Sequence, residues 1–135
     1  MKFLLLVPLM FTTGFHLFAA EPVLKFTITK PDGVSATYEF LVPGEEPNQG
    51  ATLAGDNAAA RQQNAGVAAL AWAKQFYGAH EVYLRSVQLK ETEPAPYYLA
   101  TFDGEVAGAR QVFFAVVLTS GAVVQPIELA PGLAQ

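Results

Sequence analysis

The sequence contains no cysteine, a single tryptophan and two histidines among its 135 residues. The lack of cysteine excludes a disulfide scaffold, thiol catalysis and a lipid anchor on a cysteine side chain. Charged residues are also few, at 15%, and the formal net charge is −4. The eight lysines and arginines are scattered singly, so there is no basic stripe to follow a phosphate backbone, and we expect no nucleic-acid partner.

One apolar run stands out, close to the N-terminus. Lys2 precedes apolar residues over 3–11, and Ala19 and Ala20 are the small residues that a signal peptidase requires. The run is shorter than the roughly 20 apolar residues that span a bilayer, and a proline, a glycine and a histidine interrupt this region. We therefore predict a cleaved signal peptide over 1–20, a secreted or periplasmic location, and no stable membrane insertion after cleavage.

The remaining residues, 21–135, are expected to form a single domain. Apolar and polar residues alternate over 24–28 and again over 34–42, which predicts two half-buried strands. The Lys-Pro-Asp-Gly sequence between them, 30–33, is typical of a tight turn, so the two strands should form a β-hairpin. A loop rich in glycine, proline and acidic residues is expected over 43–56.

A helix is predicted from Ala58 to Tyr77. Asp56 or Asn57 can cap its first turn, and Gly78 stands where a helix commonly ends in a left-handed residue. One face of this helix combines alanines, which allow close approach to a sheet, with two large aromatic side chains. The residues of that face are Ala65, Ala69, Trp72, Ala73 and Phe76.

Four further strands are predicted, over 82–90, 97–103, 111–119 and 122–128. Residues 111–119 are apolar at both alternating positions, which favours a central strand covered on both faces. Pro126 has no N–H group, so the last strand should lie at a sheet edge. The predicted fold is α+β, with one helix packed on an antiparallel sheet of about five to six strands in the order ββαββββ, and with a flexible tail over 130–135.

No motif for catalysis, metal binding or cofactor binding is recognisable. His80 is the one histidine left after leader removal, and a zinc site would need three or four ligands. Asp103 and Glu105 flank Gly104 and could form a carboxylate pair, although a glycine turn is usually solvated. No serine lies in a nucleophile elbow. We predict no catalytic residue, no metal and no cofactor.

The aromatic residues around the helix end leave two interpretations open. Tyr83, Tyr97, Tyr98 and Trp72 could line a ligand groove or a partner-binding patch, because aromatic side chains give large, rigid contact areas. They could equally fill the interface between helix and sheet. These four are the candidate binding residues, for an unknown protein or small-molecule partner.

The order of elements resembles two families of small exported domains. A helix followed by antiparallel strands is similar to PepSY-type domains, in which the last hairpin often has a glycine turn such as Thr119–Gly121. It also resembles cystatins, in which a sheet wraps one helix, and this likeness implies protease inhibition. The nearest stretch to the cystatin Gln-x-Val-x-Gly tip is Glu105–Gly108, which lacks the glutamine, and Trp72 falls in the predicted helix instead of the cystatin tryptophan loop.

These observations favour an exported, non-enzymatic binding module. Binding would use the exposed face of the sheet or the loops over 91–96 and 104–108. The first alternative is a small enzyme with a pocket between helix and sheet, in which His80 or Asp103 acts as a base. The second alternative is a cystatin-like protease inhibitor.

Overall fold

The computed structural model describes residues 21–43, 53–78, 81–92, 95–106 and 108–130. The predicted signal peptide, most of the loop predicted over 43–56 and most of the predicted tail lie outside these residues. The described chain forms the following elements in order: β1 (Glu21–Thr29), β2 (Ser35–Val42), α2 (Ala58–Tyr77), β3 (Glu81–Lys90), β4 (Tyr97–Val106), β5 (Ala109–Leu118) and β6 (Ile127–Glu128). Among them is no helix with the length and apolarity needed to cross a bilayer.

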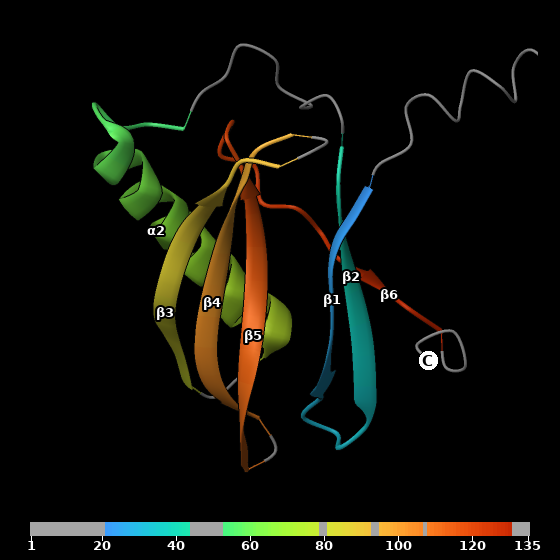
Figure 1. Ribbon diagram of the computed structural model, residues 1–135. Helices are drawn as coiled ribbons and strands as arrows, with labels where there is room; N and C mark the ends of the chain where they lie inside the picture. The colour runs from blue at the N-terminus through green and yellow to red at the C-terminus, as the bar shows by residue number, and fades with distance from the viewer. Residues whose placement is uncertain (1–20, 44–52, 79–80, 93–94, 107, 131–135) are drawn as a thin grey trace, which may run out of the picture.

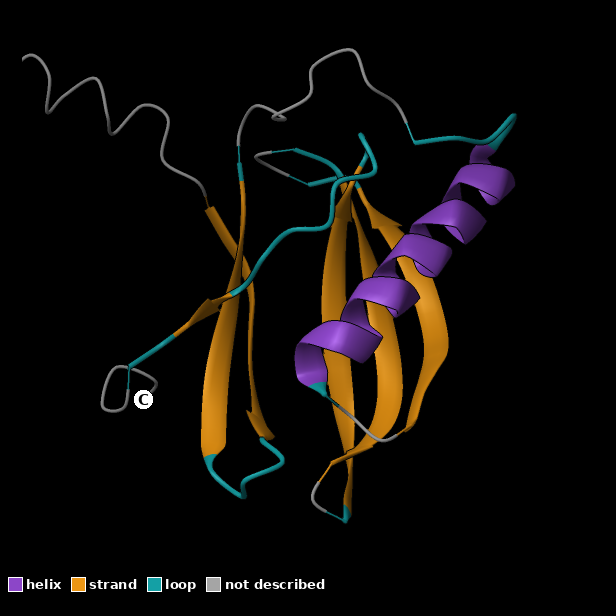
Figure 2. Ribbon diagram, turned by 180° about the vertical axis from the view of Figure 1, so that it is seen from behind, coloured by secondary structure: helices purple, strands orange, loops and turns teal. Residues whose placement is uncertain are grey.

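The strands form two antiparallel sheets of three strands each, in the orders β1-β2-β6 and β3-β4-β5 (Figure 1). The α+β class and the antiparallel pairing are therefore confirmed, but the prediction of one sheet of five to six strands is wrong. Alternation of apolar residues identifies a strand and its buried face, whereas it does not say which strand lies at which edge. The helix covers one face of β3-β4-β5, and β1 and β2 stand beside β5 (Figure 2).

The helix begins and ends at the predicted residues. The Asn57 side chain accepts a hydrogen bond from the backbone N–H of Ala60 at 2.8 Å, as an N-cap does. Gly78 ends the helix with φ of 62°, a left-handed conformation that glycine adopts without a Cβ clash. On the face toward β3-β4-β5, the predicted alanines Ala65, Ala69 and Ala73 are fully buried.

β4 is the central strand of its sheet, and it runs through Gly104. The predicted end of this strand at residue 103 is therefore wrong. The central position predicted for 111–119 is also wrong, because β5 is at the sheet edge. A Cβ atom on Gly104 would lie 2.4 Å from Cε2 of Phe113, so the glycine makes room for a neighbouring ring. Both faces of the C-terminal half of β5 are nevertheless buried, because β1-β2-β6 packs against this edge.

The strand predicted over 122–128 is divided between the two sheets. Val123 forms a bridge with Val117 of β5, and residues 127–128 then pair with β2 as β6. Pro126 lies between the two pairings, where its missing N–H interrupts no ladder. The predicted edge position is confirmed, since β6 is the outer strand of β1-β2-β6.

A cluster of aromatic rings, which we call the aromatic joint, connects both sheets to the end of the helix. Tyr77 stacks on Phe113 with ring centroids 4.8 Å apart, and Phe26 of β1 meets Phe114 of β5 edge to face at 5.1 Å. Such contacts add to the apolar area that the rings bury. The joint consists of Phe26, Tyr38, Phe40, Trp72, Phe76, Tyr77, Phe113 and Phe114.

Candidate functional site

An open groove with a volume of about 510 Å³ lies between α2 and β3. This size is within the range of ligand-binding clefts. Its lining contains no charged side chain, and its polar groups come from two glutamines. The lining residues of this α2–β3 groove are Ala59, Gln62, Gln63, Gly66, Val67, Leu70, Leu84 and Val87.

Gly66 brings the helix close to the strand at the floor of the groove. A Cβ atom at this position would lie 3.0 Å from Cδ2 of Leu84 and 3.1 Å from Cγ2 of Val87, which is tighter than ordinary packing. Glycine inside a helix costs about 0.5–1 kcal/mol relative to alanine. The close approach accounts for its presence here. The helix turn that contains Gly66 therefore packs closely against β3. The neighbouring residue, Val67, is 63% exposed.

The outer edge of β3 forms the other half of this site. Among the described strands, β3 pairs only with β4. On the outer edge, the carbonyl oxygen of Val87 accepts a hydrogen bond of 2.7 Å from Nε2 of Gln62. Backbone groups of alternate residues face the same edge of an antiparallel strand. Leu89 therefore presents its N–H and C=O to the same side as Val87, where an added strand could pair.

A smaller, charged hollow lies on the opposite face of β3-β4-β5. Its volume is about 90 Å³, and it is lined by Glu81, Tyr83, Gly104, Glu105 and Arg110. The Tyr83 hydroxyl donates to Oε1 of Glu81 at 3.1 Å, and this hydrogen bond raises the pKa of Tyr83. A space of this size holds a few water molecules and no larger ligand.

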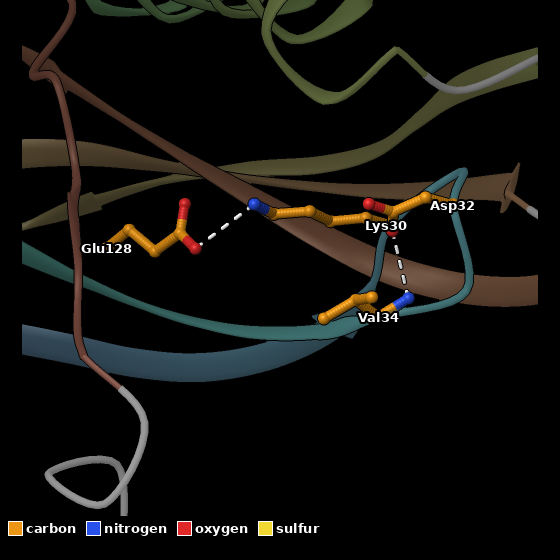
Figure 3. Close-up of polar contacts among 4 residues, drawn as sticks. All are labelled: Lys30, Asp32, Val34 and Glu128. Carbon is orange, nitrogen blue, oxygen red and sulfur yellow. Dashed lines mark hydrogen bonds and ion pairs between the residues drawn. The ribbon is translucent and has the colours of Figure 1, made fainter.

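A third concavity, of about 470 Å³, lies where the first hairpin meets the end of α2. Its charged groups satisfy each other, because Nζ of Lys30 contacts Oε2 of Glu128 at 3.1 Å (Figure 3). This hydrogen bond raises the pKa of Lys30. The nearby turn is closed by Oδ1 of Asp32, which accepts from the N–H of Val34 at 2.9 Å. With its charges paired internally, this cleft offers a ligand mainly apolar and aromatic walls.

The structure does not bring the four predicted aromatic residues together on one surface. Tyr97 and Tyr98 are buried on opposite faces of β4, each in a different part of the core. Trp72 belongs to the aromatic joint, partly buried between Phe40 and Phe76. Of the four, only Tyr83 is mostly exposed, and it borders the small hollow.

Of the two residues considered as catalytic bases, the structure describes only Asp103. His80 lies outside the described residues. Asp103 is in β4, and its Oδ2 lies 3.3 Å from Nε of Arg85. The Asp103 carboxylate therefore already has a cationic partner in its own sheet. The described part of the chain also contains no cluster of three or more metal-ligating side chains.

The sequence suggested a pocket between helix and sheet only as an alternative, and none of the residues that line the α2–β3 groove was among the predicted site residues. The available signal was the glycine at position 66 inside an otherwise strong helix, since a helical glycine often marks close backbone approach. A second signal was β3 itself, which has apolar residues at 82, 84, 87 and 89 and so departs from simple alternation once. The structure explains the departure by a register shift between Leu84 and Ser86, which is a β-bulge at Arg85.

Comparison with known proteins gives no match to a family model, a curated protein or a solved structure. The likenesses to PepSY-type domains and to cystatins are therefore likenesses of element order, and shared element order does not establish shared function.

Proposed function

We propose that this chain is a non-enzymatic binding domain that takes up an extended, apolar peptide strand along β3 and in the α2–β3 groove. The observation that carries this proposal is the coincidence of an unpaired strand edge with an uncharged apolar groove. Proteins that bind by strand addition combine these two features. The edge supplies main-chain hydrogen bonds, and pockets beside it receive alternate side chains.

The edge is open to such a strand. Most of the residues of β3 are exposed, and Leu84 and Leu89 are large apolar side chains left in contact with solvent. An incoming strand would pair with backbone groups on the side that Val87 faces. Because a β-strand places every second side chain on one face, half of the ligand's side chains would lie over the helix-side groove.

The groove favours apolar side chains of moderate size. Gly66 leaves the floor low, while Val67 and Leu70 form the helix wall. No lining side chain could pair with a buried charge, so a charged ligand residue would lose hydration without compensation. The Gln62 and Gln63 amides could orient the ligand backbone at the rim, since each carries both donors and an acceptor.

A fluorescein-labelled decapeptide of alternating valine and threonine, with terminal lysines for solubility, would test this proposal. Its binding to the chain is measured by fluorescence anisotropy. Val67→Lys places a charge at the groove wall. The substitution removes apolar contact with the peptide and adds a cost for desolvating the lysine. The two effects together should reduce the binding free energy by about 1–2 kcal/mol, so binding should weaken about tenfold. Val34→Lys is the matched control, because Val34 is 59% exposed and lies in the first hairpin, away from the groove.

The control should bind as the unmodified chain does. A second control is the same peptide with proline at its central positions, which removes N–H donors and should abolish strand pairing. Equal weakening by both lysine substitutions would show that binding does not use the groove. Equal affinity for the proline peptide would show that it does not use the edge, and either result would refute the proposal.

A further inference from the structure

The sequence of β3, Glu81–Lys90, is complementary to itself when it is placed against a second copy in the antiparallel direction. With a two-fold axis between Arg85 and Ser86, apolar residues meet apolar residues and the charged ends meet opposite charges. The facing pairs are Glu81 with Lys90, Val82 with Leu89, Tyr83 with Gln88, and Leu84 with Val87, each formed twice. We propose that the strand bound at the β3 edge is β3 of a second copy of this chain, an inference that rests on the proposed function.

The burial pattern of β3 supports this register. Val82, Leu84, Val87 and Leu89 pair with Gly104, Phe102, Ala100 and Tyr98 of β4, respectively. Directly opposite residues share a face, and these β4 residues belong to the helix side of the sheet. The four apolar residues of β3 therefore lie on one face, the face that carries the groove.

The bulge at Arg85 is what makes this pattern symmetric. In a regular strand, residues 84 and 87 would face opposite sides, because side chains alternate. One extra residue between them returns Val87 to the side of Leu84. Two copies related by a two-fold axis can then bring Leu84 of each against Val87 of the other. The exposed leucines at 84 and 89 would both be covered.

Electrostatics near the axis does not oppose the pairing. Arg85 of each copy would lie close to the axis, where two like charges would repel each other. However, Nε of Arg85 lies 3.3 Å from Oδ2 of Asp103 in its own sheet, and this negative charge offsets part of the repulsion. At the ends of the strand, Glu81 and Lys90 are of opposite sign and are both unpaired with other charges in the described part of the chain.

The hydrogen bond from Gln62 to the Val87 carbonyl is compatible with this arrangement. A carbonyl oxygen has two lone pairs, so it can accept from a second N–H while it keeps the first donor. The hydrogen bond is also exposed, which makes its replacement inexpensive. The helices of the two copies would lie on the same face of a joined sheet, one on each side of the axis, with the two grooves meeting between them.

The absence of cysteine allows a direct test of the register in the full chain. Tyr83→Cys and Gln88→Cys are introduced in separate chains, and both positions are exposed. In the proposed register, residue 83 of one copy faces residue 88 of the other, within the 4.4–6.8 Å that a disulfide requires between Cα atoms. Two copies of residue 83 would instead be roughly 15 Å apart along the strands. Mild oxidation of the mixture should give at least about five times more linked dimer than either variant alone.

A charge exchange provides a second measurement that leaves the apolar contacts unchanged. Glu81→Lys alone and Lys90→Glu alone each place like charges at both ends of the pairing. Sedimentation equilibrium should show dimerisation weakened about tenfold in each variant and restored in the equimolar mixture, where opposite charges meet again. Both variants retain all the groove-lining residues.

Equal disulfide formation in the mixture and in the separate variants would refute the second-copy pairing, as would an equimolar charge mixture no more dimeric than its parts. If decapeptide binding is still weakened by Val67→Lys in that case, the binding function survives and only the identity of the partner is wrong. If neither a copy nor the peptide binds, both proposals fail.

Discussion

The two edges of the β3-β4-β5 sheet differ in how many of their backbone groups bond to other parts of the molecule. At the β5 edge, two segments, the end of α2 and residues 122–124, form three hydrogen bonds with backbone groups of β5. Tyr77 donates its hydroxyl to the Phe114 carbonyl at 2.6 Å, the Val124 N–H donates to Val116 at 2.9 Å, and the Leu118 N–H donates to Ala122 at 2.8 Å. At the β3 edge, the described chain provides one exposed glutamine hydrogen bond.

Side-chain packing repeats this difference. Phe114, Val116 and Leu118 of β5 are covered by aromatic and aliphatic residues from β1 and β2. Next to this edge, the Gln111 amide bonds to both backbone groups of Thr29, so that a side chain substitutes for a strand neighbour between the two sheets. On β3, by contrast, Leu84 and Leu89 are left exposed.

An uncovered strand edge invites pairing with another chain, and proteins usually blunt such edges with charge, proline or covering elements. Here one edge is covered by a whole sheet, while the other retains apolar residues beside an uncharged groove. The first edge therefore has contacts that can stabilise the domain, whereas the second edge pairs with no other strand in the described part of the chain.

The largest effect is expected from Phe40→Ala, which breaks the contact between β1-β2-β6 and the β5 edge. Phe40 is 0% exposed and packs in the cluster that contains Val116 and Leu118. Removing a buried phenylalanine side chain leaves a cavity and costs about 3–5 kcal/mol of unfolding free energy. Urea denaturation followed by circular dichroism measures this loss.

Ile127→Ala is the matched control, because Ile127 lies in the same sheet but is 48% exposed. It should change the free energy of unfolding by less than about 0.5 kcal/mol. Similar losses for the two substitutions would show that sheet β1-β2-β6 does not stabilise the domain through its contact with β5.

A sharper test compares the two glutamines that bond to backbone groups near the two edges. Gln111→Ala removes both hydrogen bonds to Thr29 at a part-buried position and should cost about 2 kcal/mol of unfolding free energy. Gln62→Ala removes one exposed hydrogen bond and should cost about 0.5 kcal/mol. Thermal and urea denaturation of both variants measure the ratio.

Gln111→Glu separates shape from hydrogen bonding in the same experiment. The carboxylate keeps the size of the amide but cannot donate to the Thr29 carbonyl, so the variant should be closer to Gln111→Ala than to the unmodified chain. A glutamate variant as stable as the unmodified chain would contradict the role of the amide as a bridge between the sheets.

The sequence predicted the local elements well and their assembly poorly. Asn57 and Gly78 determine the helix ends through backbone capping, which depends on near neighbours in the chain. Which strands become neighbours depends on contacts between distant residues, such as Gln111 with Thr29, and no local pattern encodes them. The predicted export and the predicted leader over 1–20 stay predictions.

The candidate site shows the same limit. Tyr97 and Tyr98 looked available for binding because tyrosine tolerates partial exposure, but β4 is the central strand and buries both. The groove depends instead on a missing side chain at Gly66 and on a bulge at Arg85. Both features are visible in the sequence as single exceptions to a pattern, and they acquire meaning only when α2 and β3 are placed side by side.

A smaller effect than that of Gln111→Ala is expected from Tyr77→Phe, which removes one of the three backbone contacts described at the β5 edge. The lost hydrogen bond to Phe114 should cost about 1 kcal/mol at neutral pH. Burial raises the pKa of Tyr77 above 10, so the folded state holds this proton more tightly than the unfolded state does. The contribution of the protonated Tyr77 hydroxyl to the free energy of unfolding is therefore fully present below about pH 10. This contribution is lost as the pH rises above 10, by up to about 1.4 kcal/mol per pH unit. The difference in the free energy of unfolding between the variant and the unmodified chain should then shrink in urea denaturations above pH 10.

Tyr83→Phe, at an exposed position on β3, is the control and should have a smaller effect at neutral pH. If the gap between Tyr77→Phe and the unmodified chain stayed constant up to pH 11, the Tyr77 hydroxyl would not be buried against β5, and this edge would be less fully covered than we describe.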